Sequence, residues 1–125
     1  MSKKILIVDD EPNIVISLEF LMRREGFEVL VARDGEEALQ TTRSQQPDLV
    51  LLDVMMPKLN GFEVCKQIRA DQALAGTRVI MLTAKGRQAE ITKGLELGAD
   101  GYITKPFSTR DLVVQVKNLL GAEET

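Results

Sequence analysis

The sequence predicts an α/β fold in which helices cover both faces of a five-stranded parallel sheet. Short apolar runs alternate with helical patterns along the chain, which is typical of βαβ units and a parallel sheet. The central runs are apolar at consecutive positions, as expected for strands that are covered on both faces. The predicted strands are Ile5–Val8, Glu28–Ala32, Leu49–Asp53, Val79–Thr83 and Gly101–Lys105.

The first and last helices carry clear start and stop signals. Pro12 suits the first helical position, and Gly26 suits the left-handed residue that follows a helix end. Ser108 is the expected N-cap of the last helix. The apolar faces expected to be buried consist of Ile14, Leu18, Leu21 and Met22 in the first helix, and of Leu112, Val116, Leu119 and Leu120 in the last.

A helix expected from about residue 87 to residue 97 is the weakest element. Its apolar stripe is little more than Ile91 and Leu95. An interior glycine, here Gly94, costs a helix about 1 kcal/mol relative to alanine. We therefore expect this helix to be the element that is most easily displaced.

Composition and charge limit the classes of function. With 125 residues, 44% hydrophobic and 28% charged, the chain fits one globular domain over residues 1–125. The net charge of −3 argues against direct nucleic-acid binding, and no apolar run is long enough to span a membrane. Cys65 has no partner for a disulfide, so a cytoplasmic location is expected. The absence of histidine excludes Ser–His and Cys–His catalysis and nearly all zinc sites.

Polar residues stand at the carboxyl ends of most predicted strands. Asp9 and Asp10 follow the first strand, and Asp53, Thr83 and Lys105 end the third, fourth and fifth. Open α/β sheets bind ligands at this edge, where the strand order reverses. A flavodoxin-like order 2-1-3-4-5 makes the first and third strands neighbours about 4.8 Å apart, so the three acids would share one small space. Lys105 would stand roughly 10 Å from Asp53, within reach of an extended side chain.

This set of side chains indicates phosphoryl chemistry. Clustered carboxylates without histidine or cysteine favour a hard cation, and an open shell with few protein ligands fits Mg²⁺. Lys105 adds a positive charge and Thr83 a hydroxyl donor, both suited to a phosphoryl group. Asp53, alone on the central strand, is the expected nucleophile.

Several short motifs follow one another in a specific order and spacing. They are Ile5–Glu11, Leu51–Pro57, Asn60–Gly61, Leu82–Ala84, Gly98–Asp100 and Lys105–Phe107. Together they resemble the receiver domain of bacterial two-component response regulators. The resemblance covers nearly the whole chain.

The resemblance implies a role for each polar residue. Asp53 would accept a phosphoryl group from a sensor histidine kinase or a phosphotransfer protein. The implied Mg²⁺ ligands are Asp10, Asp53, the main-chain carbonyl of Met55 and, directly or through water, Asp9. The implied phosphate contacts are Lys105, the Thr83 hydroxyl and the main-chain amide of Ala84. The Lys105–Pro106 peptide bond is expected to be cis.

The resemblance also implies a switch. Phosphorylation of Asp53 would draw Thr83 inward, and Tyr102 would fill the vacated space. The surface of the fourth helix, fifth strand and fifth helix would then change and control a downstream protein. Met55 and Lys85, two residues after Asp53 and Thr83, offer no carboxylate or amide to orient water, so slow self-hydrolysis is expected.

Departures from the family pattern bear on self-association. Lys93, Glu96 and Asp100 fit the charged set with which receivers of winged-helix DNA-binding proteins form dimers. Gly101 stands where a second acid is common, and Gln115 where an arginine is expected. We therefore expect a monomer or a weak, phosphorylation-dependent dimer. A stand-alone receiver fits better than an excised domain, which is the alternative.

Two other functions compete with a phosphorylated switch. A phosphatase or phosphotransferase of the haloacid-dehalogenase type also uses Mg²⁺ and an aspartate after an apolar strand. It normally needs a second aspartate two residues later, where this chain has Met55. The other alternative is a receiver fold that is no longer phosphorylated and serves only as an interaction module. The complete set of acids with Thr83 and Lys105 favours the switch, which is a regulator and not a turnover enzyme.

Overall fold

Parallel strands form one five-stranded sheet in the order β2-β1-β3-β4-β5 in the computed structural model, which describes residues 3–56, 59–84 and 87–121. The predicted fold class and strand order are confirmed, and each strand lies within one residue of its predicted bounds. The strands are β1 (Lys4–Val8), β2 (Glu28–Ala32), β3 (Leu49–Asp53), β4 (Arg78–Ala84) and β5 (Gly101–Lys105).

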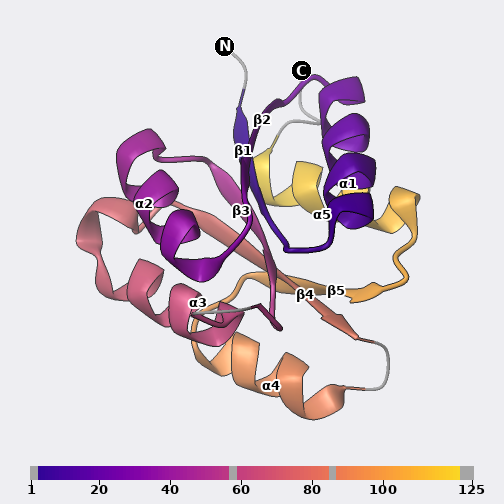
Figure 1. Ribbon diagram of the computed structural model, residues 1–125. Coiled ribbons are helices and arrows are strands. Elements are labelled where there is room, and N and C mark those ends of the chain that lie inside the picture. The colour runs from indigo at the N-terminus through magenta and orange to yellow at the C-terminus, as the bar shows by residue number, and fades with distance from the viewer. Residues whose placement is uncertain (1–2, 57–58, 85–86, 122–125) are drawn as a thin grey trace.

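Helices cover both faces of this sheet (Figure 1). On one face lie α1 (Pro12–Arg24) and α5 (Thr109–Leu120), and on the other lie α2 (Gly35–Gln45), α3 (Gly61–Ala70) and α4 (Gln88–Glu96). Successive residues of a strand point to opposite faces, so each strand contributes to two cores. Ile7 and Leu51 pack with α1 and α5, whereas Leu6 and Val50 pack with α2 and α3. In the described parts of the chain, no helix has the length and apolar character needed to cross a membrane.

The ends of α1 and α5 lie where the local signals predict them. Pro12 is the first residue of α1, and Gly26 has a φ of +92° just beyond its end. At the start of α5, the Ser108 hydroxyl oxygen accepts a hydrogen bond from the Asp111 amide at 3.2 Å. The expected apolar faces are buried at Leu18, Leu21, Met22, Leu112 and Val116, and only partly buried at Ile14, Leu119 and Leu120.

The packing of α4 corrects one expectation. Ile91 is buried, but Leu95 is 45% exposed, so its predicted place in the buried stripe is wrong. Gly94 takes that place, because a Cβ atom there would lie 3.1 Å from Cγ of Met81. The missing side chain therefore lets α4 pack closely on β4. At the start of the helix, Arg87 makes no side-chain capping hydrogen bond.

Candidate functional site

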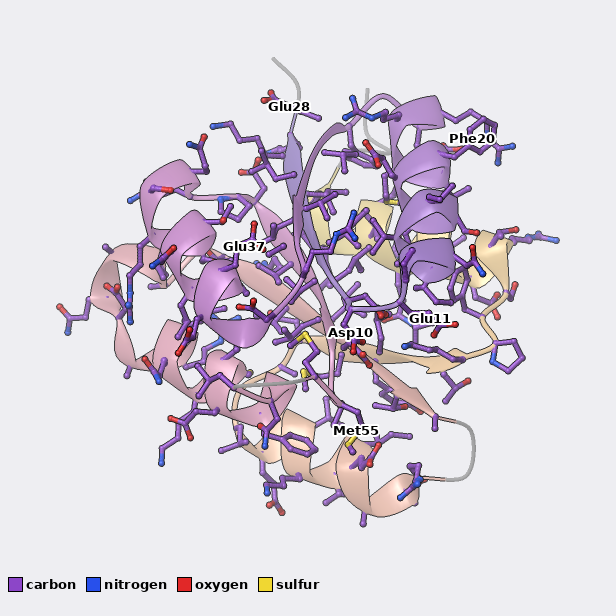
Figure 2. All side chains as sticks on the ribbon, in the orientation of Figure 1. Asp10, Glu11, Phe20, Glu28, Glu37 and Met55 are labelled. Atoms are coloured by element: carbon purple, nitrogen blue, oxygen red, sulfur yellow. The ribbon has the colours of Figure 1, made fainter. Side chains whose placement is uncertain are left out.

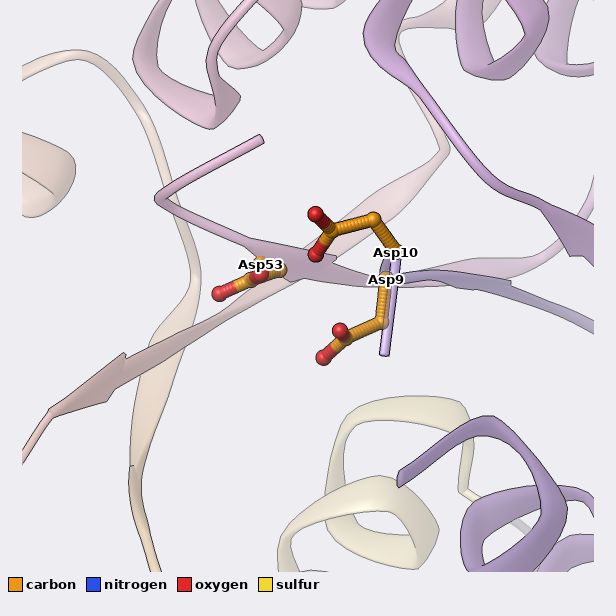
Figure 3. Close-up of side chains that lie close together, drawn as sticks. All are labelled: Asp9, Asp10 and Asp53. Atoms are coloured by element: carbon orange, nitrogen blue, oxygen red, sulfur yellow. The ribbon is translucent and has the colours of Figure 1, made fainter. Parts of the chain in front are cut away.

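Three carboxylates converge at the carboxyl ends of β1 and β3 (Figure 3). One oxygen from each of Asp9, Asp10 and Asp53 lies within 4.8 Å of the other two. Asp9 is fully buried and Asp53 is 6% exposed, while Asp10 is exposed. Asp10, Glu11 and Met55 lie at the same end of the sheet in Figure 2. The predicted acidic cluster is therefore present and is open to solvent on the side of Asp10.

Lys105 reaches from β5 to two of these acids. Its Nζ lies 3.2 Å from Oδ1 of Asp53 and 3.0 Å from Oδ2 of Asp9. The reach to Asp53 is confirmed, but the ion pair with Asp9 was not predicted. Strand order favours Asp53, because β3 lies two strands from β5 and β1 lies three, so the contact with Asp9 depends on the path of the lysine side chain. The Lys105–Pro106 peptide bond is cis, as predicted.

Charge and burial make Asp53 an unusual carboxylate. Burial, and then the neighbouring charge of Asp9, raise the pKa of Asp53 from 3.8 to about 6 against the opposing effect of Lys105. Burial alone would lower the pKa of Lys105, but its hydrogen bond to Asp9 and the charge of Asp53 raise it above its usual value. A cation among the carboxylates would relieve their repulsion. The all-oxygen donor set suits Mg²⁺.

The backbone around Asp53 is held by short-range contacts. The main-chain N–H of Met55 donates a hydrogen bond to the Asp53 carboxylate. Gly61, at the start of α3, donates its N–H to the carbonyl of Val54 at 2.9 Å. A Cβ atom on Gly61 would lie 2.9 Å from Cα of Val54 and would overlap the carbonyl oxygen of Asp53. The absence of a side chain at residue 61 therefore allows α3 to begin directly against the end of β3.

Thr83 presents a buried hydroxyl at the end of β4. Its Oγ1 has no hydrogen-bond partner among the described residues. A buried polar group without a partner costs roughly 1–3 kcal/mol, so an incoming acceptor oxygen would be favourable at this position. Ala84 follows Thr83 and lies beside Lys105 in the register of β4 and β5.

A cleft of about 260 Å³ opens beside the carboxylates, and Asp10, Asp53, Met55 and Ala84 contribute to its lining. Glu90, from the first turn of α4, also lines the cleft and was not predicted as a site residue. Its position seven residues after Thr83, at the start of the helix that follows β4, is the signal that could have identified it. Lys85, which was expected to influence hydrolysis, lies outside the described residues.

Tyr102 precedes the buried Ile103 on β5 and is 41% exposed. Its main-chain carbonyl accepts a hydrogen bond at 3.0 Å from Nε2 of Gln115 in α5. A Cβ atom on Gly101 would lie 2.6 Å from Oε1 of this glutamine. The two departures noted at residues 101 and 115 are therefore neighbours in space, and Gln115 occupies the room that a side chain at residue 101 would need.

Two members of the charged set expected for dimers make contacts within the chain. The Asp100 carboxylate accepts a hydrogen bond from the Val79 amide at 2.8 Å and forms ion pairs with Arg69 at 2.9 Å and Arg78 at 3.5 Å. The Lys93 Nζ lies 4.6 Å from the centroid of the Phe62 ring.

Comparisons with known proteins agree with this geometry. The family model described as the response regulator receiver domain matches residues 5–117. The alkaline phosphatase synthesis transcriptional regulatory protein PhoP of Bacillus subtilis (strain 168) is 50% identical over 124 residues, which make up 99% of this chain and 51% of that protein. The chain thus spans about half the length of this curated relative.

Solved structures match over nearly their whole length. A putative response regulator from Chloroflexus aurantiacus is 38% identical with a TM-score of 0.94, and the match covers 97% of this chain and 99% of that one. The receiver domain of the sensor histidine kinase PA1611 from Pseudomonas aeruginosa is 29% identical with a TM-score of 0.89, at 97% and 99% coverage. That structure has a magnesium ion coordinated in its active site cleft.

Proposed function

Because the chain belongs to the family of response regulator receiver domains, we propose that it is a phosphorylation-dependent signalling switch whose phosphoacceptor is Asp53. The observation that carries this proposal is the convergence of three carboxylates with the ammonium group of Lys105 in one cleft. The phosphoryl donor is a phosphohistidine on a sensor histidine kinase or a phosphotransfer protein, and the output is taken up by a downstream protein.

In the proposed transfer, a carboxylate oxygen of Asp53 attacks the phosphorus atom of the phosphohistidine. The new P–O bond forms as the P–N bond breaks, and the leaving imidazole nitrogen keeps the electron pair and takes a proton from solvent. Lys105 moves from Asp53 to an oxygen of the incoming group. The amide of Ala84 and the Thr83 hydroxyl, which has no partner among the described residues, also contact this group. These donors stabilise charge on the transferred group without themselves reacting.

Mg²⁺ is the proposed cofactor, held by Asp10, Asp53 and the carbonyl of Met55, with Asp9 contributing directly or through water. When bound, the ion would neutralise charge on the phosphoryl oxygens during transfer. The magnesium in the cleft of the Pseudomonas receiver supports this choice. Both oxygens of the fully buried Asp9 already have partners, since Oδ2 pairs with Lys105 and Oδ1 accepts a hydrogen bond from the Glu11 amide, which supports a water-mediated role for Asp9.

The proposed output is a change in the surface of α4, β5 and α5 in which Thr83 moves inward and Tyr102 follows. The uncapped start of α4 and the exposure of Tyr102 support this proposal. Dimer formation through the charged set should be weak, because Asp100 and Lys93 already have partners within the chain. The proposed state is therefore a monomer or a weak, phosphorylation-dependent dimer that acts on a protein effector.

Incubation with acetyl phosphate and Mg²⁺ should add one phosphoryl group to the chain, measured as intact mass. The gain should be absent without Mg²⁺ and absent in Asp53→Ala, because both the ion and the nucleophile are required. A gain in the Asp53→Ala variant would contradict the assignment of the acceptor. No gain in the wild type, with acetyl phosphate or with a phosphohistidine donor, would favour an interaction module.

In the phosphorylated sample, amide hydrogen exchange between residues 85 and 104 should change, and unchanged exchange there would rule out the proposed switch.

The phosphorylated form should lose its phosphoryl group slowly. The side chain of Met55 is 70% exposed at the cleft and has no group that orients a water molecule, and Lys85 is also unable to accept a hydrogen bond from water. The double variant Met55→Asn with Lys85→Glu should therefore hydrolyse at least about tenfold faster, which is less than the roughly 10²–10⁴-fold that a well-positioned acid or base contributes. The check is the decay of phosphorylated mass after the donor is removed, and equal decay in both proteins would refute the expectation.

A further inference from the structure

We infer that Gly35 is a positioning residue for the phosphoacceptor site, because it lets the start of α2 touch the loop that connects Asp53 to α3. The described parts of this loop, residues 54–56 and 59–60, are called the acceptor loop below. Gly35 lies in a different element from every residue assigned to the site above. The inference rests on the proposed function of Asp53 as the acceptor.

The contact between Gly35 and Leu59 leaves no room for a side chain. Gly35 is buried as the first residue of α2. A Cβ atom there would lie 2.8 Å from the carbonyl carbon and 2.6 Å from Cβ of Leu59, and it would overlap the carbonyl oxygen. These atoms belong to the main chain or are bonded directly to it, so no change of rotamer relieves the overlap. Either α2 or the acceptor loop must move.

The start of α2 is the more firmly held of the two. Oδ1 of the N-cap residue Asp34 accepts a hydrogen bond from the Glu37 amide at 2.8 Å, and the Glu37 carboxylate accepts one from the Arg33 amide at 3.0 Å. Ala38 and Leu39, in the first turns of the helix, are buried in the core between α2 and the sheet. A side chain at residue 35 would therefore displace the acceptor loop.

A push on Leu59 would reach the acceptor through Asn60 and Gly61, because Gly61 contacts the main chain of Asp53 and Val54. Val54 and Gly61 are joined by a main-chain hydrogen bond of 2.9 Å, and Asn60 caps α3 by accepting from the Glu63 amide at 3.0 Å. A displacement of Leu59 is thus passed through Gly61 to Val54. The next residue is Met55, whose amide donates to the Asp53 carboxylate. In Figure 1 the helices α2 and α3 lie side by side.

Gly35→Ala should weaken Mg²⁺ binding and slow phosphorylation by acetyl phosphate, each by about tenfold, since a displacement near 1 Å at a reacting group costs up to about a hundredfold. In metal-free protein, the amide NMR signals of Met55 and Asp53 should shift. The matched control is Gly76→Ala, which adds the same methyl group at an exposed residue where a Cβ atom meets nothing within 4 Å. The control should behave like the wild type in all three measurements.

The outcomes separate the two proposals. If the wild type neither binds Mg²⁺ nor accepts a phosphoryl group, the proposed function fails. If the wild type does both and Gly35→Ala behaves like Gly76→Ala, the role of Gly35 is refuted. If Gly35→Ala does not fold, Asp34→Ala loosens the start of α2 and should raise the Mg²⁺ dissociation constant two- to threefold. An unchanged constant in that folded variant would equally overturn the inference.

Discussion

Replacing Lys105 with methionine will destabilise the metal-free protein by about 3 kcal/mol at pH 7.5. Removing one partner of a buried ion pair leaves an uncompensated charge, which typically costs about 3–5 kcal/mol. Here two acids lose their cation, since Nζ of Lys105 lies 3.0 Å from the fully buried Asp9 and 3.2 Å from Asp53. The lower end of the range is expected because the Lys105 side chain is 22% exposed. Methionine keeps the unbranched shape, so the loss reports charge and not packing.

Urea unfolding in the presence of a chelator measures this effect. The matched control is Lys117→Met. In the wild type the Lys117 ammonium group pairs with Glu25 at 2.8 Å, and both side chains keep considerable solvent contact. Exposed pairs contribute at most about 1 kcal/mol, so the control should lose far less. Mg²⁺ should recover part of the stability of Lys105→Met, because the ion supplies the missing positive charge. Equal losses in the two variants would show that the acids do not depend on Lys105.

Asp53→Asn will stabilise the metal-free protein by roughly 1–3 kcal/mol at pH 7.5, although it removes the proposed acceptor. The pKa of Asp53 is raised from 3.8 to about 6, chiefly by burial and next by the charge of Asp9. The folded state therefore holds this proton more tightly than the unfolded state does, and ionisation costs folding free energy. The cost is absent below about pH 4, grows as the pH rises to about 6, and is complete above that value. At about 1.4 kcal/mol per pKa unit, its upper limit is about 3 kcal/mol.

The pH dependence distinguishes this cause from a general effect of the substitution. The difference in unfolding free energy between Asp53→Asn and the wild type should be near zero at pH 4 and should reach its maximum above pH 6. The control Asp111→Asn removes a carboxylate from the first turn of α5, where the helix dipole favours negative charge. The free energy of unfolding of that variant should be lower than that of the wild type by up to about 1 kcal/mol, an effect opposite in sign to that of Asp53→Asn. A stability difference for Asp53→Asn that does not vary with pH would contradict the electrostatic account.

Local patterns predicted the sheet and most of the site. Apolar runs such as Leu49–Leu52 define strands whatever surrounds them, and the residues that end those strands meet because parallel strands end at one edge. For the same reason, Lys105 could be placed within reach of Asp53 before its contacts were known. These predictions needed only the spacing of strands and the position of each residue along its own strand.

Contacts between elements could not be predicted in this way. The preference of Lys105 for both Asp9 and Asp53 depends on side-chain paths that strand order does not contain. Gly94 was interpreted as a weakness of its helix, whereas its missing side chain permits contact with Met81. A glycine in a sequence indicates backbone freedom or the need for a residue without a side chain, but it does not identify the neighbouring residue that occupies the space.

The bridge from Lys105 to Asp9 joins residues 96 positions apart. Domains are synthesised from the N-terminus, so both acidic strands exist before the lysine has been made. A nascent or truncated chain that ends before β5 holds its acids without the Lys105 ammonium group, and β4 keeps only β3 as a paired strand. Under the proposed function, such a chain lacks the lysine that contacts the acceptor, so a kinase would phosphorylate copies that are complete through the fifth strand and not unfinished ones.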